Sequence, residues 1–216
     1  GDVGRMAILP RELLAPWQSL LREPHPLKGN GRAPVQPLVV LPILTLLLRM
    51  RGQRWADLGL RLPTDVPRFI REAPLQCLVI VALGYALRYA TLALLPAGAG
   101  SPLLNLHGSV PAFLVALAYT SLLVGLTEEL QIRGLLMDRF ATIFGGSKAA
   151  WASSVIASSV VFGLLHFTNG IGNVVFAIGM GLVFGVTYLR AGRNLLIVII
   201  AHSAYDSVRV IEGFLR

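Results

Sequence analysis

The sequence predicts an all-α protein, a polytopic transmembrane helical bundle. Hydrophobic residues make up 55% of the chain, charged residues only 14%, and the mean hydropathy is +0.68. A soluble domain carries about 25% charged residues, so this composition indicates a membrane protein. Because a spanning helix needs about 20 mostly apolar residues, the 216 residues can supply about six spans.

The chain divides into a lead-in and one membrane domain. Residues 1–34 mix apolar side chains with Arg, Glu and Pro, which predicts either an interfacial amphipathic helix or a loosely ordered lead-in. Residues 35–216 form the predicted transmembrane domain, and its motif-bearing part is 110–211. In chain order the expected spans are Leu38–Leu48 with its flanks, Ala73–Leu95, Val110–Thr127, 149–166, 174–189 and Asn194–Val210.

Spans four and five come from one long uncharged segment. The 41 residues between Lys148 and Arg190 carry no formal charge, and Phe167–Asn173 breaks this segment in two. The break is either a connection or a re-entrant piece that lines a cavity. Small residues at helical spacing predict close packing of these two spans: Ser153, Ala157, Gly181 and Gly185.

The net charge of +8 is consistent with a membrane protein. In a soluble protein it would suggest nucleic acid, but beside anionic lipid it fits basic cytoplasmic loops, so no nucleic-acid partner is expected. The connections after spans one, three and five carry Arg or Lys, and the other two carry none. The positive-inside rule therefore predicts a multi-pass protein of the cell membrane with its site towards the cytoplasmic side. The five basic residues of the N-terminal segment fit this orientation poorly unless a first helix lies in the membrane plane.

Two adjacent carboxylates interrupt the apolar sequence. Glu128 and Glu129 follow Pro96–Thr127, which has no charged side chain. A charged residue at the centre of a membrane helix costs about 2.5–3.5 kcal/mol on insertion scales, and such groups usually serve a function. Arg133 lies four residues after Glu129, the spacing at which opposite charges meet on a helix, so Glu128 is left without a local partner. The alternative to a functional site is that these acids and the arginine form a polar cap at a helix end, with their charges reaching the membrane surface.

Two later spans carry histidines. Phe162 lies one turn before His166 and could pack over it, and His202 and Asp206 form an i,i+4 pair in which the carboxylate could orient the imidazole. With the glutamates they supply a general base, a general acid and oxyanion donors, or alternatively metal ligands. If a metal is bound, zinc is the candidate, with the ligands Glu128, His166, His202 and Asp206.

Three motifs in order resemble the CPBP family, the CAAX-processing and bacteriocin-processing (ABI) intramembrane endopeptidases that include the type II CAAX prenyl endopeptidase. The motifs are Glu-Glu-x-x-x-Arg, Phe-x-x-x-His and His-x-x-x-Asp/Asn, here Glu128–Arg133, Phe162–His166 and His202–Asp206. Trp55–Leu60 also resembles the Leu-Gly-Leu element of these proteins. The resemblance covers about residues 110–210 and, loosely, 38–72. His-Glu-x-x-His and Gly-x-Ser-x-Gly motifs are absent from the sequence.

The resemblance implies a role for each residue. Glu128 would activate a water, His166 would help to hold it, and Arg133 would orient the acidic pair with Glu129 behind it. His202 and Asp206 would stabilise the oxyanion or hold the leaving group. The prenyl protease branch has Asn at the last position, whereas an ionised Asp only accepts hydrogen bonds, so Asp206 suits orienting His202 or binding a metal. The motif leaves the use of zinc open.

The function expected from the resemblance is hydrolysis of a peptide bond in a membrane-associated peptide or protein, for which a prenylated CAAX-type substrate is one candidate. A non-proteolytic membrane scaffold or immunity protein of the same fold is the alternative, and a small transporter is a third. One geometric difficulty arises. At 1.5 Å per residue, His166 would lie about 27 Å beyond the start of its span and His202 about 12 Å beyond the start of its own.

Overall fold

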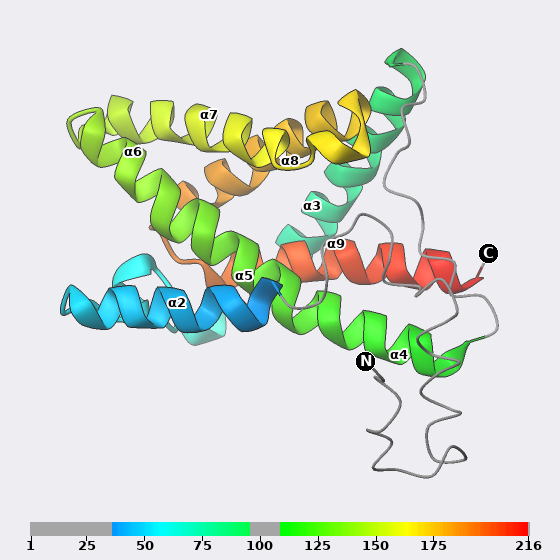
Figure 1. Cartoon of the computed structure of the whole chain (residues 1–216), viewed down its shortest axis with the longest axis horizontal. Helices are drawn as coiled ribbons and strands as arrows, with labels where there is room; N and C mark the ends of the chain where they lie inside the picture. Colours follow the sequence, from blue (N-terminus) through cyan, green and yellow to red (C-terminus); the bar gives the residue numbers. More distant parts are fainter. Residues whose placement is uncertain (1–35, 96–108, 216) are drawn as a thin grey trace, which may run out of the picture.

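The computed structural model describes residues 36–95 and 109–215, and every regular element in these residues is a helix (Figure 1). The predicted all-α bundle is therefore confirmed. The interfacial helix or lead-in expected in residues 1–34 lies outside the described residues.

Each of the six predicted spans corresponds to one helical rod. The single helices are α2 (Gln36–Met50), α3 (Val66–Leu94), α7 (Lys148–Leu164), α8 (Ile171–Arg190) and α9 (Leu196–Leu215). The remaining rod joins α4 (Val110–Tyr119), η2 (Thr120–Val124), α5 (Gly125–Glu129), η3 (Leu130–Leu136) and α6 (Met137–Ile143). Short 3₁₀ turns are η1 (Trp55–Leu58) and η4 (Phe167–Asn169).

Three rods of the described chain are long and apolar enough to cross a membrane by length and composition: Val66–Leu94, Val110–Ile143 and Ile171–Arg190. Pro37–Met50 and Lys148–Leu164 are shorter apolar helices. Large apolar side chains such as Leu78 and Leu92 of α3 point outward and are exposed. An outward apolar surface is what lipid requires and water disfavours, so the chain is a membrane protein.

Two π-helical segments interrupt the 34-residue rod. The segments η2 and η3 are π-helical, and they flank the short α-helical stretch that ends at Glu129. The Gln131 amide donates to the Thr127 carbonyl (3.0 Å), which gives this carbonyl a side-chain donor where the register changes. π-helical turns occur frequently at functional sites because they redirect the side chains that follow.

A tight turn joins α7 and α8 at the Phe167–Asn173 break. The short η4 ends at Gly170, whose φ of 88° favours glycine. Gly181 and Gly185 pack closely on α7, as the small-residue pattern predicted, although their nearest neighbours are Ser159 and Val155. The predicted partners Ser153 and Ala157 are not the closest contacts, since the two helices interlock along a neighbouring face of α7.

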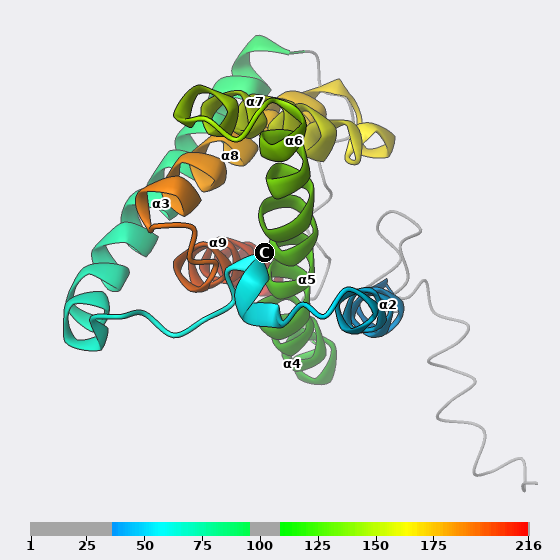
Figure 2. The ribbon, with the colours of Figure 1, turned by 90° about the vertical axis from the view of Figure 1, so that its left-hand side faces the viewer.

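Helix α9 lies between α3 on one side and the long rod on the other (Figure 2). In Figure 1, α7 and α9 run in the same direction, and α9 begins and ends further along that direction than α7 does. The Phe162 ring, near the end of α7, lies 4.8 Å from the His166 ring and 6.5 Å from the His202 ring, so the two histidines lie on either side of one phenylalanine contact. The difference in depth expected from the sequence disappears because the two helices do not begin at the same level.

The close packing of α7 on α8 gives a stability test. An added Cβ at Gly163 would lie 2.3 Å from Ile178 Cγ1 and 2.8 Å from the Val174 carbonyl oxygen. Gly163→Ala should therefore destabilise the bundle by about 1–3 kcal/mol, as overpacking does, and lower the Tm in detergent. Gly172→Ala is the matched control, because nothing lies within 4 Å of its Cβ. Equal melting temperatures for the two variants would contradict the packing.

Candidate functional site

The centre of the site is the carboxylate of Glu129, which has no exposed surface. Its Oε1 accepts a hydrogen bond from Arg133 Nη1 at 2.9 Å, so the pair expected from the i,i+4 spacing is present. The same oxygen accepts from His202 Nδ1 at 2.7 Å. A buried charge is stable only when paired and hydrogen-bonded, and Glu129 obtains both partners from two different helices.

Arg133 connects this carboxylate to α8. Its Nη2 donates to the Gly181 carbonyl at 3.2 Å, and its guanidinium lies 4.8 Å from the Phe162 ring and 5.2 Å from the Phe184 ring. The side chain is only 1% exposed. Between two aromatic faces a desolvated guanidinium gains cation–π attraction, which adds to the ion pair and fixes its orientation.

The second nitrogen of His202 faces the other two carboxylates. Nε2 lies 3.9 Å from Glu128 Oε2 and 3.6 Å from Asp206 Oδ2. Both distances exceed a direct hydrogen bond and are of the length that one water can bridge. The side chains of Glu128 and Asp206 are 20% and 25% exposed, so this edge of the ring is the accessible one.

His166 lies beside the cluster at the end of α7. Its Nδ1 is 2.8 Å from the Phe162 carbonyl oxygen, and since a carbonyl only accepts, Nδ1 carries the proton. The Nε2 atom is then the acceptor of the neutral ring. His166 is partly exposed and close enough to Asp206 to interact with it electrostatically.

Phe162 joins the two histidine motifs. Its ring meets the His166 ring edge to face at 4.8 Å, which is the contact predicted from the spacing, and it lies 6.5 Å from the His202 ring. Phe184 stacks on the His202 ring, with a centroid distance of 4.9 Å and an interplanar angle of 19°. The three motifs therefore converge, with aromatic rings filling the space between their polar groups.

Two features of the site differ from what the sequence indicates. The carboxylate that orients His202 through its Nδ1 is Glu129 and not Asp206, because the α9 register turns Asp206 towards the Nε2 edge. Phe184 and the Gly181 carbonyl were not predicted as site groups. A phenylalanine and a glycine in an apolar helix carry no local signal of such a role, and only their distance to Arg133 reveals it.

The zinc site considered from the sequence needs several ligands at one point. In residues 36–95 and 109–215, no group of three or more His, Cys, Asp or Glu side chains is arranged to hold a metal ion.

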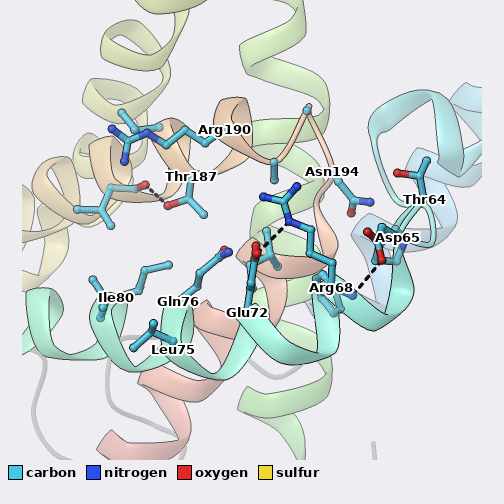
Figure 3. Close-up of a pocket in the computed structure, with 18 of the residues that line it drawn as sticks. Thr64, Asp65, Arg68, Glu72, Leu75, Gln76, Ile80, Thr187, Arg190 and Asn194 are labelled. Atoms are coloured by element: carbon cyan, nitrogen blue, oxygen red, sulfur yellow. Dashed lines mark hydrogen bonds and ion pairs between the residues drawn. The ribbon is translucent and has the colours of Figure 1, made fainter.

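A separate hollow of about 1040 Å³ lies between the first half of α3 and the last half of α8 (Figure 3). Its polar end includes the Arg68–Glu72 ion pair (2.9 Å), and Asp65 accepts from the Arg68 backbone N–H. Its apolar walls include Leu75 and Ile80 of α3. None of the motif residues lines this hollow, so the polar cluster is a distinct site.

The fold and the cluster define a class: membrane-embedded helical proteins that gather carboxylates and imidazoles from separate helices around a buried arginine. Residues 110–208 match the family model described as "Type II CAAX prenyl endopeptidase Rce1-like". The chain therefore carries an Rce1-like domain, and the recognition from the three motifs is confirmed. In general terms this supports a CAAX-type intramembrane endopeptidase that acts on a peptide or protein at the membrane. No curated protein and no solved structure matches the chain.

Breaking the buried ion pair should cost far more than breaking an exposed one. Arg133→Met leaves Glu129 charged and short of its main partner, and we expect a loss of about 3–5 kcal/mol in unfolding free energy. The double variant Arg133→Met/Glu129→Leu should recover part of that loss because it removes the unpaired charge.

The matched control is Arg68→Met, which removes the exposed pair with Glu72, where the arginine side chain is 64% exposed. We expect little change for this variant, because solvent screens exposed pairs. Thermal and denaturant unfolding in detergent measure both effects. Equal losses for the two variants would show that the buried pair has no special role.

Proposed function

We propose that the protein is an intramembrane endopeptidase in which Glu128 activates a water for attack on a peptide carbonyl. The observation that supports this most directly is the approach of Glu128 and Asp206 to the same nitrogen of His202, at 3.9 Å and 3.6 Å. A general base must lie within hydrogen-bond reach of its water, and a bridging water at this point would be in reach of Glu128.

In the proposed reaction Glu128 takes a proton from the water, and the water oxygen forms a bond to the carbonyl carbon. Collapse of the tetrahedral intermediate breaks the C–N bond, and Glu128 returns the proton to the leaving amine. His166 would help to hold the water, since its Nδ1 proton is committed to the Phe162 carbonyl and its Nε2 can accept. Base catalysis of this kind contributes typically about 10²–10⁴-fold.

His202 and Asp206 would face the oxyanion. An oxyanion needs hydrogen-bond donors, so in this proposal His202 carries a proton on both ring nitrogens and the Asp206 carboxyl is protonated where they face it. Glu129 accepts the Nδ1 proton of His202 at 2.7 Å and so directs the Nε2 edge towards the substrate. Arg133 holds Glu129 in place, so both act as positioning residues in this proposal. Groups held in advance in a water-poor site stabilise developing charge strongly, because no reorganisation is needed during the reaction.

The substrate that this site would take is a membrane-associated peptide or protein, with a prenylated CAAX-type C-terminus as the finer proposal. The family description names this substrate class, and the site lies among helices that are apolar on their outer surface. The positive-inside rule, applied to the basic connections, supports a site near the cytoplasmic half of the cell membrane.

Replacing the proposed base tests the function. Glu128→Gln keeps the shape but cannot take a proton, so peptide hydrolysis by purified protein should fall at least about 10²-fold while the Tm changes little. Glu72→Gln is the control, because this exposed glutamate lies on α3 in the separate hollow. Full activity of Glu128→Gln would refute the mechanism. A cellular phenotype that survives both Glu128→Gln and His166→Ala would favour the scaffold or immunity alternative.

The role of the last motif position has its own test. If Asp206 faces the oxyanion, Asp206→Asn supplies an amide donor at the same place and should retain turnover within about tenfold. Asp206→Ala removes the group and should lower kcat about 10²–10³-fold, as the loss of one oxyanion donor does. If Asp206→Asn is as inactive as Asp206→Ala, the ionised carboxylate is required and the oxyanion role is wrong.

A further inference from the structure

The hollow between α3 and α8 is closed at one end by direct contact of the two helices. An added Cβ at Gly179 of α8 would lie 3.2 Å from the Leu87 side chain of α3. From there towards the start of α3 and the end of α8, the helices enclose about 1040 Å³ (Figure 3). Ligand sites run to about 1,000 Å³, so this volume is large enough for a ligand that the proposed hydrolysis does not use.

The open end of the hollow carries more positive than negative charge. It is lined by the arginines Arg61, Arg68 and Arg190 and by the carboxylates Asp65 and Glu72. Both carboxylates are held by Arg68: Glu72 accepts from its side chain at 2.9 Å, and Asp65 accepts from its backbone N–H at 2.9 Å. In residues 36–95 and 109–215, neither Arg61 nor Arg190 forms an ion pair with a carboxylate. These two arginines therefore have charge available for an anion.

Arg61 is fixed beside the end of α8. Its Nη2 donates to the Gly192 carbonyl at 2.9 Å, and its own carbonyl accepts from Asn194 Nδ2 at 3.0 Å. Since Arg190 precedes Gly192 by two residues, these bonds bring two distant arginines to one rim. A guanidinium has five N–H donors in a planar fork, so Arg61 can bind an anion while keeping its contact with Gly192. Arginine forks suit phosphate in particular.

The walls become apolar with distance from this rim. Along α3, Figure 3 shows Gln76 between the Arg68–Glu72 pair and Ile80. The lining then continues with Leu83 of α3, and Val186 faces it from α8. These last two side chains are 44% and 41% exposed, so the protein itself does not cover them. Each wall thus passes from charged to apolar in the same direction, which matches a ligand with a charged head and an apolar tail.

The length of the hollow matches one leaflet of a bilayer. Positions 68 and 83 of α3 are about 22 Å apart along the helix at 1.5 Å per residue. Half of a bilayer of about 40–45 Å, headgroups included, is about 20–22 Å. The charged rim lies at the basic connections before α3 and after α8, and the positive-inside rule supports a cytoplasmic position for both. Anionic lipids are abundant in that leaflet, and basic pockets between membrane helices bind their headgroups.

We propose that the hollow binds one anionic phospholipid, with its phosphate at Arg61 and Arg190 and an acyl chain between α3 and α8. The excess positive charge selects an anionic over a zwitterionic headgroup, because both lining carboxylates are already bonded to Arg68. The apolar walls select a lipid over a free phosphate. The Gln76 amide, one level below the rim, can donate to an ester carbonyl of the lipid.

Lipid titration of the full-length protein in detergent, followed by native mass spectrometry, tests the selectivity. The probes are dioleoyl phosphatidylglycerol, dioleoyl phosphatidylcholine and inorganic phosphate. One phosphatidylglycerol should bind per chain with a Kd at least tenfold below that of phosphatidylcholine, and inorganic phosphate should not displace it. Because a ligand of the folded state stabilises it, phosphatidylglycerol should also raise the Tm more than phosphatidylcholine does.

Removing the two arginines tests the rim. Arg61→Gln/Arg190→Gln should weaken phosphatidylglycerol binding at least tenfold and abolish the preference over phosphatidylcholine. Arg71→Gln/Lys148→Gln is the matched control: it removes two exposed charges near the same ends of the bundle, and neither residue lines the hollow. Equal losses in the two double variants would show a general effect of surface charge and overturn the proposal.

A second variant leaves the charges intact, since Arg61→Gln also removes the bond to Gly192. Val186→Trp fills the hollow with a large side chain and should weaken phosphatidylglycerol binding at least tenfold, while the Tm without lipid changes little. Val175→Trp is its control, because Val175 is a similarly exposed residue of α8 (44%) that does not line the hollow. Unchanged lipid binding in Val186→Trp would overturn the proposal.

Two results with the wild type would also overturn it. Equal Kd values for phosphatidylglycerol and phosphatidylcholine would show unselective lipid contact. Displacement of the lipid by inorganic phosphate would show a simple anion site. These measurements use no catalytic activity, so they can succeed or fail independently of the proposed endopeptidase function.

Discussion

The site depends on one buried oxygen. Glu129 Oε1 accepts hydrogen bonds from Arg133 of the long rod and from His202 of α9, and it has no access to solvent. In a low-dielectric interior an uncompensated carboxylate would be very costly, so the two donors and the carboxylate must assemble together. Arg133 also donates to the Gly181 carbonyl, which ties the same point to α8. Three helices are thereby held in register at the cluster.

Aromatic packing keeps this polar centre rigid. Phe184 contacts both the Arg133 guanidinium and the His202 ring, and Phe162 contacts Arg133 and His166. The rings exclude water from the Glu129 side and leave the Nε2 edge of His202, with its two carboxylates, as the wetter side. Burial strengthens the hydrogen bonds on the closed side, because electrostatic interactions are stronger at low dielectric. One imidazole is therefore fixed on one edge and available for chemistry on the other.

Local spacing predicted much of this site. The i,i+4 pair of Glu129 and Arg133 and the contact of Phe162 with His166 follow from helix geometry alone, because residues four apart share a face. The bond between Glu129 and His202 joins residues 73 positions apart, and no periodicity connects them. The π-helical turns on both sides of the glutamate pair were equally inaccessible, since an amino-acid pattern does not encode a one-residue change of hydrogen-bonding register.

The amino-acid sequence alone determined that this is a helical membrane protein, where its apolar helices lie and which polar motifs interrupt them. Lipid requires apolar side chains outside and a backbone whose hydrogen bonds are satisfied within the helix. It also carried the family resemblance. Tertiary structure alone decided which nitrogen of His202 is bound, which carboxylate binds it, and how His166 and His202 meet despite their unequal positions along their helices. Those outcomes depend on the axial offset of α9 against α7 and on the rotation of each helix, which are set by packing between helices.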